Sequence, residues 1–452
     1  MTHIGHDPSA PTARQPFGWG AVARLGLAQI AIGAVAAIMT STLNRVMVVE
    51  LALPATVPSL FVAVHFVLQM SRAKFGFDSD RSGHRAPWIL GGVALFSLGG
   101  VAAALGVAVA AERLGPGLAL AGVGYGLIGI GMSAAGTALL AHVAEEMEPR
   151  RLGGAAAMLW IMMILGIAVT AGVSGRLLDP FSFPRLVRVI AAVCGIAVVL
   201  AAIAAHGSWG IRRPAAVPTA GAGEEAGFRA VLRDALADQP TRRFALFVFA
   251  AMLAYSAQDL ILEPFAGRVF GFTPGQSTAL GGTQHGGVML GMLGAALLSA
   301  RLGSLRHWAV GGCLASAVAL LALAQSPALG GRALPGIIFA LGVANGIFAV
   351  GAIGAMMAMT TADGTRGTGI RLGVYGAAQA IAYAAGSLGG GVASDLTIRG
   401  FGDPARGYTA VFATEAVLFV VAAAMAMAST PSTRAGILRR RDAGDAILGA
   451  MR

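Results

Sequence analysis

Charged side chains are scarce in this sequence of 452 residues: only 12% are Asp, Glu, Lys or Arg, whereas 56% are hydrophobic. A water-soluble domain carries about 25% charged residues, because these groups solvate its surface. The composition therefore excludes an ordinary soluble enzyme and predicts a surface that contacts lipid. Cysteine is also rare. Cys194 and Cys313 both lie in apolar runs, which excludes a disulfide framework and indicates small packing residues.

Long uncharged runs dominate what remains. A helix needs roughly 20 apolar residues to cross a bilayer, and six runs without any charge are long enough: 86–111, 114–141, 152–175, 308–331, 333–362 and 372–394. Shorter or once-interrupted runs fill the gaps, at about 25–43, 51–71, 189–205, 243–263, 276–300 and 407–429. We therefore expect an all-α integral membrane protein with twelve transmembrane helices.

The net charge of +11 is distributed unevenly along these runs. If residue 1 is cytoplasmic and every run crosses, 23 of the 32 Lys and Arg residues lie on the cytoplasmic side. Cytoplasmic loops of membrane proteins carry such an excess, so both termini are expected in the cytoplasm. No aromatic-rich basic face accompanies the charge, and no nucleic-acid partner is expected.

The longest polar stretch between runs lies in the middle of the chain and reads as a linker with a short interfacial helix. The two flanking halves echo each other, as in transporters built from repeated bundles, whose working site lies between the repeats. The expected parts are a cytoplasmic N-terminal tail (1–20), an N-terminal six-helix bundle (21–206), a cytoplasmic linker (207–241), a C-terminal six-helix bundle (242–430) and a cytoplasmic C-terminal tail (431–452).

The sharpest local motif joins the second and third runs, where glycines permit tight turns and an acid can pair with arginines. It resembles the signature loop of the major facilitator superfamily, Gly-x-x-x-Asp-Arg-x-Gly-x-Arg. In that superfamily the loop is a conformational latch on the cytoplasmic side, so it indicates the fold and says nothing about the cargo. The matching residues are Gly76, Asp80, Arg81, Gly83 and Arg85.

Three further segments are similar to the PucC/LhaA family, a branch of that superfamily in phototrophic bacteria. They are residues 42–51 (TLNRVMVVEL), 86–89 (APWI) and 258–271 (QDLILEPFAGRVFG). The short loop after the second run is most similar to the subgroup labelled "bacteriochlorophyll synthase 44.5 kDa chain". The resemblance implies bacteriochlorophyll as bound cargo, light-harvesting polypeptides or pigment-synthesis enzymes as partners, and the photosynthetic inner membrane as location.

Polar groups within spans are costly and are therefore functional hypotheses. Asp259 and Glu263 are four residues apart and share a helix face near the end of the seventh run. In one interpretation the charges pair across the halves or take up protons. In the other they are helix-end charges that reach the interface, satisfied by Arg45 and Arg268. The set comprises Asn44, Arg45, Glu50, Asp259, Glu263 and Arg268.

Histidines in the apolar runs are candidate axial ligands for the magnesium of a bacteriochlorin, because neutral imidazole is a good ligand. His65 and His285 are the candidates, and Gln69 or Gln284 is a candidate donor to a ring carbonyl. Tyr375 and Gln379 share a face with Tyr383 and are candidates to line a cavity. The alternatives are that each histidine bonds a neighbouring helix and that this face packs helices together.

Two functions remain open: a pigment-handling assembly factor and a proton-coupled secondary transporter of a small apolar solute. Enzymatic prenyl transfer would need paired Asp-rich motifs at the membrane. The chain has a single Asp-x-x-x-Asp, at Asp234 and Asp238, in the linker. We therefore expect no catalytic site, despite the word "synthase" in the subgroup label.

Overall fold

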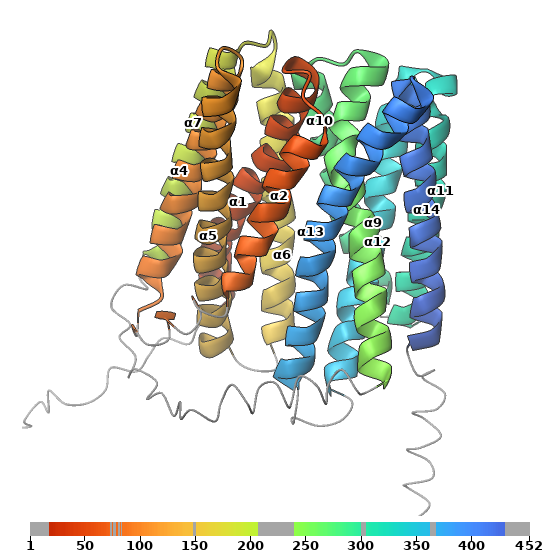
Figure 1. The fold of residues 1–452 in the computed structure, drawn as a ribbon. Helices are drawn as coiled ribbons and strands as arrows, with labels where there is room; N and C mark the ends of the chain where they lie inside the picture. Colours follow the sequence, from red (N-terminus) through yellow and green to blue (C-terminus); the bar gives the residue numbers. More distant parts are fainter. Residues whose placement is uncertain are drawn as a thin grey trace, which may run out of the picture.

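The chain forms a bundle of long helices that run side by side (Figure 1). The computed structural model describes residues 18–72, 75, 78–79, 82, 84–147, 151–206, 239–299, 304–361 and 368–429. Every regular element in these residues is helical. The described residues before 207 are called the N-terminal half, and those from 239 onward are called the C-terminal half. The predicted boundaries of the two bundles, the linker and the tails stay predictions.

The helices follow the apolar runs closely. The N-terminal half contains α1 (Trp19–Ala37), η1 (Ile38–Leu43), η2 (Val46–Glu50), α2 (Thr56–Leu68), η3 (Gln69–Ser71), α4 (Ala86–Ala110), α5 (Leu114–Glu146), α6 (Leu152–Leu178) and α7 (Phe183–Ala205). The C-terminal half contains α9 (Gln239–Phe270), α10 (Pro274–Ser299), α11 (Leu305–Leu329), η4 (Gly331–Ala333), α12 (Leu334–Thr361), α13 (Thr368–Phe401) and α14 (Pro404–Ser429).

Nine helical segments are long and apolar enough to cross a membrane among the residues described. The segment Thr56–Ser71 is apolar but shorter. Helices α10 and α13 have 26 and 34 residues and fall outside the nine. Glycine, glutamine, histidine and hydroxyl residues lower the hydropathy of these two helices. Such a composition suits helices that contact other helices more than lipid.

Local signals explain where several helices begin. Pro184 stands in the first turn of α7, and the Ser182 hydroxyl accepts a hydrogen bond from the Arg185 amide at 3.3 Å. The start of α10 has a reciprocal pair: the Thr273 hydroxyl accepts from the Gln276 amide at 3.1 Å, and the Gln276 side chain accepts from the Thr273 amide at 3.0 Å. These caps satisfy amide groups that an apolar medium would otherwise leave unpaired.

Short connections gather at one end of the bundle, the upper end in Figure 1. They comprise residues 51–55, 111–113, 179–182, 271–273, 330–333 and 402–403. Successive helices therefore run in opposite directions, and we call this end the short-loop end. It is also the end at which the two halves exchange most of the hydrogen bonds described below.

The halves meet along two helix pairs, α6 with α10 and α2 with α13. Glycines allow the first pair to approach with backbones in contact. A Cβ atom added at Gly175 of α6 would lie 2.6 Å from the carbonyl oxygen of Gly275 in α10. In lipid, the hydrophobic effect does not drive helices together. Small residues at such a crossing let the two backbones approach closely, and the resulting van der Waals contacts hold the helices together. The glycine content of the chain thus contributes directly to how the halves join.

The substitution Gly175→Ala is predicted to lower the midpoint of thermal unfolding in detergent by several degrees. The added methyl group overpacks the crossing of α6 and α10, which costs about 1–3 kcal/mol. Gly172→Ala is the matched control on the same helix, because a Cβ there meets nothing within 4 Å. It should keep or raise the midpoint, since alanine favours helix more than glycine does. Equal effects of the two changes would contradict the close crossing.

Candidate functional site

Polar side chains of the first helix reach across to the C-terminal half. The Asn44 amide nitrogen donates to the carbonyl oxygen of Leu260 at 2.5 Å, and the Arg45 guanidinium donates to the carbonyl oxygen of Phe272 at 2.7 Å. Both residues lie where α1 widens into the π-helical turns η1 and η2. Such turns are rare and are found mostly at functional sites. We call this contact region between the halves, at the short-loop end, the seam.

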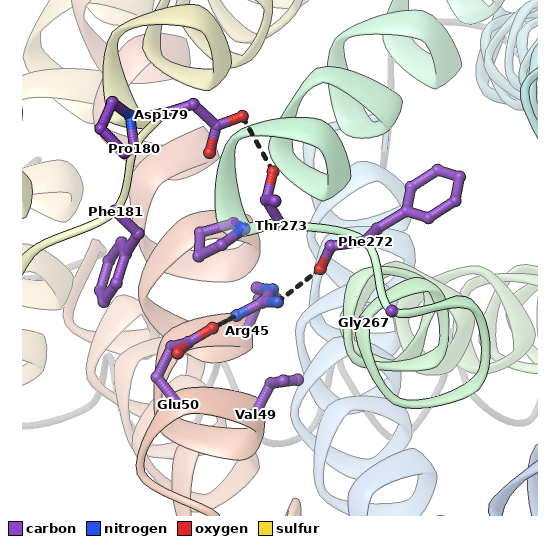
Figure 2. A pocket seen from close by; sticks show the side chains of 11 residues that line it. Arg45, Val49, Glu50, Asp179, Pro180, Phe181, Gly267, Phe272 and Thr273 are labelled. Atoms are coloured by element: carbon purple, nitrogen blue, oxygen red, sulfur yellow. Dashed lines mark hydrogen bonds and ion pairs between the residues drawn. The ribbon is translucent and has the colours of Figure 1, made fainter.

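Arg45 lies at the centre of a shallow pocket on the seam (Figure 2). Its guanidinium forms an ion pair with Glu50 of the same helix while it also donates to Phe272. Across the pocket, the Thr273 hydroxyl donates to the Asp179 carboxylate at 2.8 Å, which joins the end of α6 to the start of α10. The pocket has a volume of about 870 Å³. The pocket therefore lies between the two halves, where the seam opens at the short-loop end.

Arg268 ties the C-terminal half back to the first helix. One of its terminal nitrogens donates to the carbonyl oxygens of Val48, at 2.9 Å, and Leu53, at 3.2 Å. The Val48 carbonyl lies in the π-helical turn η2 and the Leu53 carbonyl in the connection after it, where the chain leaves the helix and its acceptors need partners. Arg268 therefore serves backbone oxygens, and no ion pair between it and Glu263 exists in the described residues.

Glu263 is buried on the seam, with 2% of its surface exposed. The hydroxyl of Ser41, in η1, donates to one carboxylate oxygen, and the hydroxyl of Thr278, in α10, donates to the other at 3.3 Å. The position of Glu263 is about 10 Å inside the end of α9, seven residues before Phe270. The side chain is therefore held by hydroxyl groups from both halves.

Asp395 of α13 provides a second link between the halves. One carboxylate oxygen accepts from the Ala55 amide at 2.9 Å, and the other accepts from the amide and hydroxyl of Thr56 at 2.8 and 2.7 Å. These amides open α2, so an acid of the C-terminal half caps a helix of the N-terminal half. Asp395 does not stand out in the sequence as a site residue, because its partners are about 340 residues away along the chain.

An inner group of polar and aromatic side chains lies deeper than Glu263. Asp259 is one turn below Glu263 on α9, and it lies close enough to His285 of α10, and to Tyr255 and Tyr383, for electrostatic interaction. The rings of Tyr255 and Tyr383 are 6.1 Å apart. The ring of Tyr383 is 4.9 Å from that of Phe66 in α2. We call Phe66, Tyr255, Asp259, His285 and Tyr383 the inner site.

The two candidate histidines differ in their surroundings. His65 is only 1% exposed, and its Nε2 atom lies 2.6 Å from the Gln69 amide nitrogen, from which it accepts. Gln69 in turn accepts a hydrogen bond from Arg72. His285 is 8% exposed, and its Nδ1 atom lies 2.9 Å from the carbonyl oxygen of Gly281. The Nε2 atom of His65 is therefore hydrogen-bonded to Gln69, whereas no described residue bonds the Nε2 atom of His285.

The remaining predicted residues are placed less centrally. Gln284 is 2% exposed, and its amide nitrogen has no hydrogen-bond partner in the part of the chain described. Gln379 interacts with Tyr383, and its amide lies 3.9 Å from the sulfur of Met252. The side chain of Tyr375 lies outside the described residues. In the latch, Arg85 is buried and donates to the Ser79 hydroxyl, while Gly76, Asp80, Arg81 and Gly83 lie outside the described residues.

Sequence reasoning missed the partners that complete both sites. Ser41 and Thr278 are hydroxyl residues within apolar runs, where such residues usually bond their own helix. Tyr255 and Phe66 look like ordinary packing residues. A usable signal for Tyr255 was its spacing of four from Asp259, which places both side chains on one helix face. The described residues contain no group of three or more His, Cys, Asp or Glu side chains that could hold a metal ion.

Removing the charge of Asp395 is predicted to destabilise the bundle. In Asp395→Asn the amide would face the donors of Thr56, and an unsatisfied cap costs about 0.5–2 kcal/mol. The midpoint of thermal unfolding should therefore fall measurably. The control is Asp403→Asn, because Asp403 caps α14 and pairs with exposed Arg406 at 3.7 Å, and exposed pairs contribute little. An unchanged midpoint for Asp395→Asn would refute its capping role.

The chain is similar to proteins of phototrophic bacteria over nearly its whole length. It is 47% identical over 414 residues to the "Bacteriochlorophyll synthase 44.5 kDa chain" of Rhodobacter capsulatus, covering 91% of this chain and 95% of that protein. It is 30% identical to "Protein PucC" of the same species, covering 93% and 94%. These values confirm the family predicted from the three segments and agree with the subgroup predicted from the short loop after the second run.

Solved transporters share the architecture. A bacterial homologue of the human lysosomal transporter Spinster, in an inward-facing and unoccupied conformation, superimposes with a TM-score of 0.70 at 15% identity, covering 92% of this chain and 98% of that one. At such low identity the likeness shows the fold alone, which is of the major facilitator type. The family model described as "PUCC protein" matches residues 42–432. The chain therefore belongs to the PucC family of membrane proteins.

Proposed function

We propose that this protein binds bacteriochlorophyll, or a precursor of it, and delivers the pigment during pigment synthesis or the assembly of light-harvesting complexes. The observation that carries the proposal is the 47% identity, over almost the full length of both chains, to a protein named for bacteriochlorophyll synthesis. The partners would be light-harvesting polypeptides or pigment-synthesis enzymes. The location would be the inner, intracytoplasmic photosynthetic membrane of the bacterium.

The proposed topology has twelve spans with both termini in the cytoplasm. Its support is the excess of Lys and Arg on one side of the twelve apolar runs. The six helices of each half, with their short connections at one end, accommodate this arrangement. Helices α10 and α13 would then cross the bilayer while covered on several sides by neighbouring helices.

The inner site has the groups that a bacteriochlorin requires. Aromatic side chains pack well against a planar macrocycle, and the rings of Phe66, Tyr383 and Tyr255 lie in consecutive contact, at 4.9 and 6.1 Å. A bound bacteriochlorophyll would supply a magnesium ion with a free axial position, which a neutral histidine fills well. The donor set therefore fits the group. The proposal involves no covalent chemistry on the pigment, and a non-enzymatic role is part of it.

A proton-coupled secondary transporter of a small apolar solute is the second candidate function. The specific observation in its favour is the pair of acids on α9, Asp259 and Glu263, which lie between the halves. Intramembrane acids in such positions mark proton pathways in many transporters. Proton-driven uptake of a solute into proteoliposomes by colourless protein would favour this function over pigment delivery.

Protein purified in mild detergent from phototrophically grown cells is predicted to carry bacteriochlorin absorption in proportion to the protein. The reason is that a pigment bound between helices stays with them when lipid is removed. An unrelated twelve-helix transporter, purified identically from the same cells, measures adventitious pigment. A colourless, folded preparation from pigment-replete cells would contradict the proposed function.

Cysteine labelling is predicted to place both termini on one side of the membrane. Native Cys194 and Cys313 are buried, so they give little background. A membrane-impermeant maleimide should label Glu112→Cys, an exposed position at the short-loop end, in intact cells. Ser9→Cys and Ser432→Cys, in the two tails, should be labelled only after the cells are broken. Labelling of either tail in intact cells would overturn the topology.

A further inference from the structure

The two histidines proposed as magnesium ligands are not equivalent in the structure. A carbonyl oxygen only accepts hydrogen bonds, so the contact of 2.9 Å between Nδ1 of His285 and the Gly281 carbonyl requires the proton on Nδ1. The Nε2 atom then carries the lone pair. This is the arrangement in which proteins present histidine to metals, because the second nitrogen is held by a backbone acceptor that orients the ring.

His65 is in the opposite condition. Its Nε2 atom already accepts from the Gln69 amide, at 2.6 Å, so the lone pair is occupied. The other ring nitrogen is buried without a partner, and the residue is only 1% exposed. Its ring also packs edge-on against Phe66 at 5.0 Å. Bringing a magnesium ion to His65 would require breaking the bond to Gln69 and opening this packing.

The surroundings of His285 contain one acid and two aromatic rings. Asp259 lies near enough to His285 for electrostatic interaction, while no hydrogen bond joins the two side chains among the described residues. Tyr255 and Tyr383 stand beside Asp259 and keep part of their surface exposed. Gln284 precedes His285 and is turned by about 100° around α10, so the two side chains serve different faces.

We propose that Nε2 of His285 is the axial ligand that holds the magnesium of a bacteriochlorin at the inner site, with the rings of Tyr255 and Tyr383 beside the macrocycle. This inference rests on the proposed function and adds the residue and the metal contact. In this proposal His65 has a structural role: its hydrogen bond with Gln69 joins the last turn of α2 to η3. The mode of recognition therefore depends on the magnesium ion, and the magnesium-free pigment lacks the main contact.

The test compares two pigments on one protein. Purified wild type is titrated with bacteriochlorophyll and with bacteriopheophytin, its magnesium-free form, and binding is followed by the pigment absorption spectrum. Wild type should prefer the magnesium form by about tenfold or more. His285→Phe, which keeps an aromatic ring but removes the ligand, should lose this preference. His65→Phe should retain it.

Folding and ligation are separated by a further variant and a second readout. His285→Gly removes the ligand, and added imidazole should restore the preference for the magnesium form by occupying the vacated space. Size-exclusion profiles and unfolding midpoints check that each variant is folded. A folded His285→Phe or His285→Gly protein that keeps the full preference without imidazole overturns the inference and leaves pigment binding intact. Failure of wild type to bind either pigment overturns the proposed function itself.

Discussion

Polar groups that leave water must find partners inside the protein, and this constraint organises the seam between the two halves. A buried carboxylate without donors is very costly in an apolar medium. Glu263 meets the requirement with hydroxyl donors from two helices, one from each half. Asp395 meets it with the open amides of α2. Because these donors and acceptors belong to different halves, satisfying them also holds the halves together at the short-loop end.

The same helix carries the polar groups of both sites. Along α9, Glu263, Asp259 and Tyr255 follow one another at intervals of one turn. The outermost acid is buried and bonded to hydroxyls, whereas Asp259 and Tyr255 keep some exposed surface. Under the proposed function, the turn of α9 at Glu263 joins the two halves, and the turns at Asp259 and Tyr255 contact the cargo. Any motion that opened the seam would therefore also change the surroundings of the inner site, because α9 carries residues of both.

Family membership and geometry support different parts of the interpretation. The relatives show the family, and one of them is named for bacteriochlorophyll synthesis, while the solved transporters show only the fold. The geometry distinguishes two histidines that look alike in the sequence. His65 is engaged by Gln69, and His285 is oriented by a carbonyl group, so the choice between them depends on hydrogen bonds that composition does not reveal.

The sequence by itself determined the helical elements and the family. Uncharged runs long enough to span a bilayer leave helix as the main way to satisfy the backbone, so the positions of α4, α5, α7 and α14 follow from the apolar runs alone. The segments around Arg45 and Glu263 identified the family. The loop motif at Gly76 to Arg85 agreed with the transporter fold found by comparison.

Only the tertiary structure decided which polar groups meet. Arg45 was one of the residues expected to satisfy the acids; in the structure it pairs with Glu50 and also bonds the backbone at Phe272. Asp395 was not expected to act at all, yet it caps α2. The physical reason is that helix formation depends on neighbours within a few residues, whereas the contacts of Arg45 with Phe272 and of Asp395 with α2 join groups more than 200 residues apart, whose meeting depends on how the two halves pack.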